Sequence, residues 1–220
     1  MSARESRAAL QLVTAEAVAY ATDLANRVVG SPEVRRLALL DGVPELIGYY
    51  SEGSAALAAD FYEEERELAE VRSRFAAEAV VEDRTVEIRR SIAWAASPWF
   101  DDSGDSVDAR LAEVVQLETA RPYRDTITTN RSNDPDAVGW RRVTAGGCPF
   151  CRMLADRGAV YKSDTARFAS HANCHCVAQP VFTTNDTGVE ASVLQYRASR
   201  RSRSPEQRAE LRQYLEEFYS

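Results

Sequence analysis

Apolar residues recur at alternating gaps of three and four near the start of the chain, which is the spacing of one face of an α-helix. They are Leu10, Val13, Ala17, Tyr20, Leu24 and Val28. Gly30, Ser31 and Pro32 follow directly and predict the end of this helix, because they favour turns or helix starts over helix interiors. The pattern therefore predicts an amphipathic helix from Ala8 to about Val29.

Two further helices are predicted to follow. The first runs over Pro32–Leu40 and ends at a turn formed by Asp41 and Gly42. Pro44 suits the first turn of a helix, so the next helix is predicted to begin there. Its apolar stripe continues to Phe75, which makes it the longest helix expected.

The helical pattern continues to about Asn130. A shorter helix around Thr85–Ala96 is predicted to stop before Pro98, since a proline disfavours helical geometry in the residue that precedes it. Another helix begins near Val107. Pro122 either breaks this helix or opens a short successor.

The composition of the chain changes near Asn133. Short β-rich pieces and all the cysteines follow, with a strand predicted from Val177 to Phe182. Ser204 and Pro205 predict the start of a last helix, as an N-cap and a first-turn proline. We predict a mainly α fold: an N-terminal helical region over residues 1–132, a small α+β module over 133–185, and a basic linker with a C-terminal helix over 186–220.

The charge of the chain limits its possible partners. A formal net charge of −7 argues against nucleic-acid binding by the whole protein, because affinity for phosphate needs clustered positive charge. One Arg/Ser segment is a local exception and supplies the candidate contacts to nucleic acid. These are Arg197, Arg200, Arg201 and Arg203.

No apolar run approaches the roughly 18 residues that cross a bilayer, and the polar first residues do not resemble a secretory signal. We therefore expect a protein that does not enter a membrane and is made in a reducing cytoplasm. Thiols in that compartment are more often metal ligands than disulfides.

Metal-binding residue types are concentrated in two short motifs. The motifs are Cys148-Pro-Phe-Cys151 and His171-Ala-Asn-Cys174-His175-Cys176. The CxxC and HxxC spacings each let two side chains turn toward one point, as in structural zinc sites. The sequence therefore predicts one structural zinc ion that staples the α+β module, since metal binding supplies folding energy to such small units.

Five residues compete for the four positions around the zinc ion. They are Cys148, Cys151, His171, Cys174 and Cys176. We expect Cys174 and Cys176 to face opposite sides if their segment is extended, so that one of the five is left out. Cys176 is preferred over Cys174 because the strand after it would anchor it. His175 is interpreted as an exposed bystander.

Two other interpretations of the cysteines stay open: redox chemistry by the CxxC pair, and buried reduced thiols without metal. Catalysis is not expected. The HExxH and deaminase HxE motifs and glycine-rich phosphate loops do not occur in the sequence. A zinc ion with four protein ligands also has no open position for water.

Several stretches outside and within the metal motifs carry a resemblance that covers most of the chain. They are Gly53–Arg66, Val138–Val143, Cys148–Cys151, Met153–Gly158, His171–Cys176 and Val177–Phe182. Together they resemble the phage Mu F-like minor head (minor capsid) proteins, in the form common among phages of actinobacteria. The closing HxxCxC is the most specific element of this resemblance.

The resemblance implies a virion component linked to head morphogenesis, present in few copies inside the capsid near the portal vertex. Its expected partners are the portal protein, the major capsid protein or both, with the Arg/Ser segment near packaged DNA. The alternative is a zinc-containing nucleic-acid-binding regulatory protein. A hydrolase or nuclease that uses His175 beside the metal is a further alternative.

Overall fold

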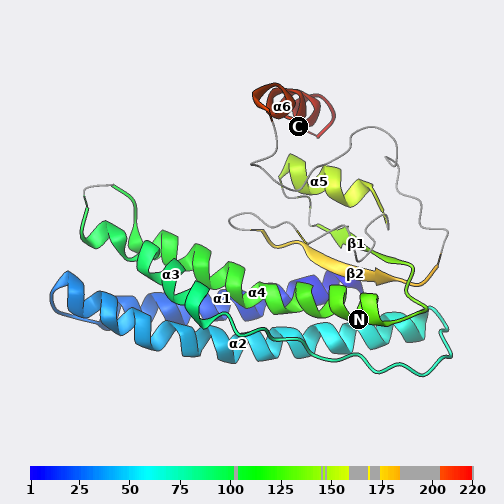
Figure 1. The fold of residues 1–220 in the computed structure, drawn as a ribbon, viewed down its shortest axis with the longest axis horizontal. Helices are drawn as coiled ribbons and strands as arrows, with labels where there is room; N and C mark the ends of the chain where they lie inside the picture. The colour runs from blue at the N-terminus through cyan, green and yellow to red at the C-terminus, as the bar shows by residue number, and fades with distance from the viewer. Residues whose placement is uncertain are drawn as a thin grey trace.

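The computed structural model describes residues 1–101, 104–144, 146, 148–158, 168, 174–183 and 204–219. Three long helices lie side by side and form most of the molecule (Figure 1): α1 (Ala3–Arg27), α2 (Pro32–Leu68) and α4 (Val107–Asn133). The short α3 (Thr85–Ala95) and the 3₁₀ turn η1 (Ser97–Trp99) pack on them. The predicted mainly α fold is confirmed.

α2 is one continuous helix, so the predicted turn at Asp41 and Gly42 is wrong. Pro44 lies inside the helix and cannot donate a hydrogen bond to the carbonyl of Leu40, four residues earlier. The guanidinium of Arg89 in α3 donates to that carbonyl instead, at 2.6 Å. A partner from another helix therefore offsets the bond that the proline removes.

Gly42 serves the approach of α1 to α2 and not a turn. A Cβ atom at this position would lie 2.9 Å from Cδ2 of Leu24, which is closer than such atoms pack. Gly48, also inside α2, has open space around the same position. The two glycines of one helix therefore face different steric limits.

This difference gives a matched pair of variants. Gly48→Ala is expected to raise the free energy of unfolding by about 0.5–1 kcal/mol, because alanine is the better helix former. The free energy of unfolding of Gly42→Ala is expected to be about 1 kcal/mol lower than that of Gly48→Ala, because the Leu24 side chain must move to make room for the new methyl group. Urea denaturation of both variants measures the difference. Equal stabilisation would contradict the close approach at Gly42.

α2 ends at Leu68, seven residues before the predicted end at Phe75. Glu70 takes a left-handed conformation with φ of 55°, and the Val71 amide bonds back to the carbonyl of Arg66 at 3.1 Å. This is the Schellman arrangement, which stops a helix. Sequence reasoning expects glycine at such a stop, and here a glutamate occupies it.

The segment between α2 and α3 runs back along α4 (Figure 1). The amides of Glu78 and Val80 donate to the side chains of Asn130 and Thr126, at 2.8 and 2.9 Å. Phe75 packs on Tyr62 with ring centroids 5.9 Å apart. Phe75, which the sequence pattern placed in a longer helix, therefore belongs to an extended segment and packs on α2.

α4 continues through Pro122 without a break, which decides between the two predictions made for that residue. Side chains on both sides of the proline, such as Ala120 and Tyr123, are buried against α1 and α2. Since tertiary packing holds both halves of α4 in line, the loss of one backbone hydrogen bond is tolerated.

Two antiparallel strands, β1 (Gly139–Val143) and β2 (Val177–Val181), lie across one end of the helices (Figure 1). Trp140 of β1 is opposite Pro180 of β2. Trp140, Val177 and Ala178 join a core cluster with buried side chains of all three long helices. The sheet is therefore fixed on the helical part by a shared apolar core.

Two further helices complete the described chain, α5 (Pro149–Asp156) and α6 (Pro205–Tyr219). Ser204 caps α6 as predicted, because its hydroxyl accepts from the Gln207 amide at 3.3 Å and its own amide donates to the Gln207 side chain at 3.1 Å. α6 packs on α5 through Tyr219, which contacts Met153 and Leu154. No described helix is long and apolar enough to cross a membrane.

Candidate metal centre

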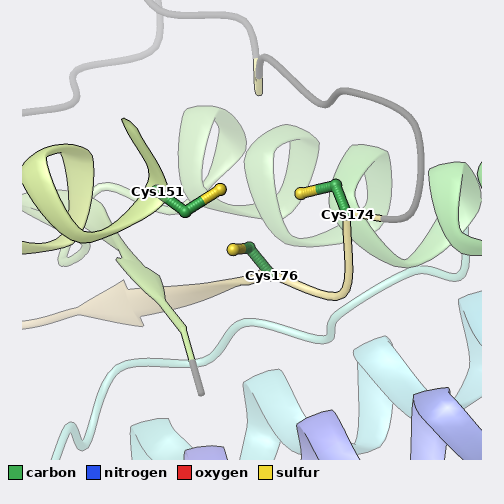
Figure 2. Close-up of side chains that lie close together, drawn as sticks. All are labelled: Cys151, Cys174 and Cys176. Atoms are coloured by element: carbon green, nitrogen blue, oxygen red, sulfur yellow. The ribbon is translucent and has the colours of Figure 1, made fainter. Parts of the chain in front are cut away.

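Three thiols meet between α5 and the start of β2. Cys151 belongs to α5, and Cys174 and Cys176 directly precede β2. Their sulfur atoms all lie within 4.8 Å of one another and point toward a common centre (Figure 2). All three side chains are buried, and none forms a disulfide. A tetrahedral metal ion with Zn–S bonds of about 2.3 Å holds its sulfurs roughly 3.8 Å apart, so the cluster fits a thiolate-bound metal.

Cys174 and Cys176 face the same side of their segment, and the prediction that they face opposite sides is wrong. Side chains two residues apart on extended backbone share a face, while the residue between them points away. His175 is that intervening residue and is exposed. The CxC spacing thus delivers both sulfurs to the cluster.

Cys148 lies at the N-terminus of α5 and packs against the three thiols. Its sulfur accepts a hydrogen bond from the backbone amide of Cys151, with 3.4 Å between nitrogen and sulfur. Pro149 occupies the first helical position, where a missing amide hydrogen costs nothing. The CxxC motif therefore folds as a helix start in which Cys148 is the N-cap of α5 and Cys151 lies in the first turn.

α4 holds the backbone of the other two cysteines. The Arg124 guanidinium donates to the carbonyl of Cys174 at 2.7 Å and to that of Cys176 at 3.2 Å. The side-chain amide of Gln116 also donates to the Cys174 carbonyl, at 2.9 Å. Both polar side chains are buried. The position of the CxC segment is therefore set by the long helix and not by the small sheet alone.

A second buried arginine reaches a sulfur directly. Nη1 of Arg142, in β1, lies 3.8 Å from Sγ of Cys174. The ring of Phe168 stacks on Trp140 at 5.5 Å and lies 3.9 Å from the Arg142 guanidinium and 4.9 Å from that of Arg124. Two cations and an aromatic pair thus surround the thiols.

The surroundings of Cys151 and Cys174 shift the pKa values of these two thiols in opposite directions. Hydrogen bonds from Cys151 and Cys176, together with the positive charge of Arg124, lower the pKa of Cys174. Hydrogen bonds to Cys174 and Cys176, together with burial, raise the pKa of Cys151.

Of the predicted ligands, the structure brings together the sulfurs of Cys151, Cys174 and Cys176, and Cys148 packs against this cluster. His171 lies outside the described residues. So do the candidate nucleic-acid contacts Arg197, Arg200, Arg201 and Arg203.

Sequence reasoning missed the side chains that surround the thiols: Gln116, Arg124, Arg142 and Phe168. One signal was available. Gln116 and Arg124 are eight residues apart, and with Ala120 between them they fall on one face of α4. Polar residues on a face that is otherwise packed indicate a buried polar partner.

The fold and the site define a mainly helical protein whose buried thiol cluster is able to bind a metal ion. The chain belongs to the VG15 protein family, whose family model matches residues 1–199. This is a viral-gene family, so the chain is a phage-type protein. No curated protein and no solved structure matches the chain.

Proposed function

We propose that the chain is a structural minor capsid protein of a tailed phage, of the Mu F-like type, located inside the head near the portal vertex. One structural zinc ion at the thiol cluster stabilises it. The observation that carries the proposal is the cluster itself. The two motifs of the Mu F-like resemblance that hold the cysteines supply all of its sulfurs, from segments far apart in the chain.

The burial of the site supports a structural role for the metal. Structural zinc sites have closed shells of four protein ligands, whereas catalytic sites keep one position open for water or substrate. The side chains of Cys151, Cys174 and Cys176 are buried. The role that we propose is therefore structural and not enzymatic.

A zinc ion here would join short elements of the chain. α5 has only eight residues and each strand has five. Elements of this size are marginal alone. One ion bound by Cys151 of α5 and by Cys174 and Cys176 before β2 would hold α5 and the start of β2 together. Both elements would then be fixed on α4.

The end of the helical part away from the sheet is the proposed docking region for the portal or major capsid protein. This end holds the α1–α2 connection, the first turns of α2 and the residue after η1, and apolar side chains from all three places are exposed. They are Val29, Val34, Leu37 and Phe100. Contact with a large assembly would cover them, as exposed apolar patches commonly mark interaction sites.

The location of the chain in phage particles tests the proposal. We expect the chain to co-sediment with DNA-filled heads in few copies per particle. Proteases should degrade it only after the heads are opened, because the capsid shell encloses it. Quantitative mass spectrometry of purified heads, before and after protease treatment, measures both properties.

A chain found free in the lysate and absent from heads would overturn the proposal. Should that free chain also bind DNA with an affinity that falls steeply with salt, the alternative of a nucleic-acid-binding regulator would replace it.

A further inference from the structure

We propose that an exposed face shared by α1 and α2 binds an arginine-rich segment of another protein. This tyrosine–glutamate face consists of Leu12, Glu16 and Tyr20 of α1 and Glu45, Tyr49 and Glu52 of α2. The face is separate from the thiol cluster and from the end that holds the α1–α2 connection, so binding there goes beyond the proposed function.

Large apolar and aromatic side chains are exposed on this face. Leu12 and Tyr49 are each 73% exposed, and Tyr20 is 55% exposed. Tyr50 is buried and connects the two exposed tyrosines, because its ring centroid lies 6.3 Å from that of Tyr20 and 5.2 Å from that of Tyr49. The rings thus form one aromatic surface across α1 and α2, which pack side by side (Figure 1). Exposed groups of this kind commonly mark interaction sites.

Three carboxylates lie among these side chains. Glu45 and Glu52 lie four residues before and three residues after Tyr49, which places all three on one side of α2. Glu16 lies four residues before Tyr20 on α1. Burial and the negative charge of Glu16 raise the pKa of Tyr50, in agreement with a position of Glu16 beside the rings. The aromatic surface is therefore bordered by acidic groups.

No basic residue of α1 or α2 balances the charge of the face. The stretches of the two helices that carry it, 8–26 and 37–65, contain no arginine, lysine or histidine. Among the ion pairs of the described residues, none includes Glu16, Glu45 or Glu52. The face is therefore negative, and a positively charged partner complements it.

Arginine fits a surface made of aromatic rings and carboxylates, because its guanidinium stacks on rings and pairs with carboxylates. The chain has this arrangement elsewhere: the Arg110 guanidinium lies 4.9 Å from the ring centre of Trp94 and pairs with Asp105. In the part of the chain that the structure describes, no cation lies over Tyr20 or Tyr49. The face thus offers rings and carboxylates to an arginine from outside.

The charge of the face disfavours two other occupants. The carboxylates would repel the phosphate groups of DNA. A second copy docked through the same face would bring like charges together, which suppresses such pairing. The Arg/Ser segment of the chain itself, residues 197–203, lies outside the described residues and is a competing source of arginine.

Binding of a fluorescent nona-arginine peptide to the full chain, measured by fluorescence anisotropy, tests the proposal. We expect binding that weakens as the salt concentration rises. Glu45→Gln combined with Glu52→Gln is expected to weaken binding by about five- to tenfold, because two exposed ion pairs are lost. Glu78→Gln combined with Glu82→Gln removes the same charge from exposed sites outside the face. This control is expected to change the affinity by less than about twofold, since salt screens distant charges.

The aromatic part of the face is tested at Tyr49. Tyr49→Ala is expected to weaken peptide binding by about two- to fivefold, because the ring under the guanidinium is removed. Tyr49→Phe keeps the ring and is expected to bind as the unmodified chain does. A loss in Tyr49→Phe as large as that in Tyr49→Ala would contradict stacking on the ring.

Absence of peptide binding would overturn the proposal. So would equal losses in the two paired glutamine variants, because the net charge and not the face would then bind the peptide. A variant that combines Arg197→Gln, Arg200→Gln, Arg201→Gln and Arg203→Gln is expected to bind the peptide as the unmodified chain does. Binding found only in that variant would show that the chain's own segment fills the face, and would also overturn the proposal. None of these outcomes depends on bound metal or on location in heads, so failure here leaves the proposed function standing.

Discussion

Cys174→Ser is expected to abolish stoichiometric zinc binding and to unfold α5 and the CxC segment, while the long helices and the sheet that shares their core stay folded. Cys174 is the central member of the cluster: its sulfur faces those of Cys151 and Cys176, and its carbonyl accepts bonds from α4. Structural zinc contributes about 10–16 kcal/mol of apparent binding energy in small zinc-dependent peptides, and that energy is folding energy.

Elemental analysis of the reduced, purified chain measures the bound zinc, and hydrogen exchange of residues 148–158 and 174–176 measures the local unfolding. A strong chelator added to the unmodified chain should reproduce the effect of the variant. His175→Ala is the control, since the exposed side chain of His175 lies between the two ligands and should leave metal content and exchange unchanged. Zinc retained by Cys174→Ser at one ion per chain would contradict the site.

Asp134→Ala is expected to lower the free energy of unfolding by about 3–5 kcal/mol, the usual result of removing one partner from a buried ion pair. Asp134 caps the end of α4 and pairs with Arg66 near the end of α2, and both side chains are almost fully buried. It also accepts a hydrogen bond from the hydroxyl of Tyr62 at 3.1 Å. The variant leaves the Arg66 charge buried without its carboxylate.

Urea denaturation measures the loss, and Asp23→Ala supplies the control. Asp23 forms an ion pair of 2.8 Å with Arg27 on the exposed face of α1, and exposed pairs contribute less than about 1 kcal/mol. The double variant Arg66→Met with Asp134→Leu is expected to recover most of the stability, because apolar pairs commonly replace buried ion pairs at little cost. If Asp134→Ala lowers the free energy of unfolding no more than Asp23→Ala does, the proposed contribution of the buried Arg66–Asp134 pair is wrong.

The sequence allowed the helical part to be predicted wherever apolar spacing was regular and bounded by turn residues. The end of α1 near Gly30 and the start of α6 at Pro205 are examples. The continuity of α2 was not predictable. The carbonyl that Pro44 leaves open at Leu40 is bonded by Arg89, a residue 49 positions away in the chain. Local rules contain no information about such a partner.

In the candidate site, too, local spacing was predictable from the sequence and contacts between distant residues were not. Spacing alone indicated that Cys148 and Cys151 belong with Cys174 and Cys176, because short motifs fix the reach of their own side chains. Position within a motif also explains why His175 is exposed, because it lies between two cysteines that share the other face of the segment. The contacts of Arg124 and Arg142 with the cluster depend on how α4 and β1 meet the CxC segment, and only the folded chain shows that.

The extended segment after α2 has a consequence for the order in which the molecule folds. This segment carries the chain back toward the end of the molecule where α2 starts, and α4 therefore runs in the same direction as α2. Contacts between the two helices join residues far apart in the sequence, such as Ser54 and Thr119, which are 65 positions apart. α1 and α2 form a local hairpin and are able to pair as soon as they are synthesised. The pairing of α2 with α4 must await a much longer stretch of chain. On the ribosome, the apolar face of α2 should therefore stay uncovered until α4 has emerged, and this interval is when the nascent chain is most exposed to aggregation.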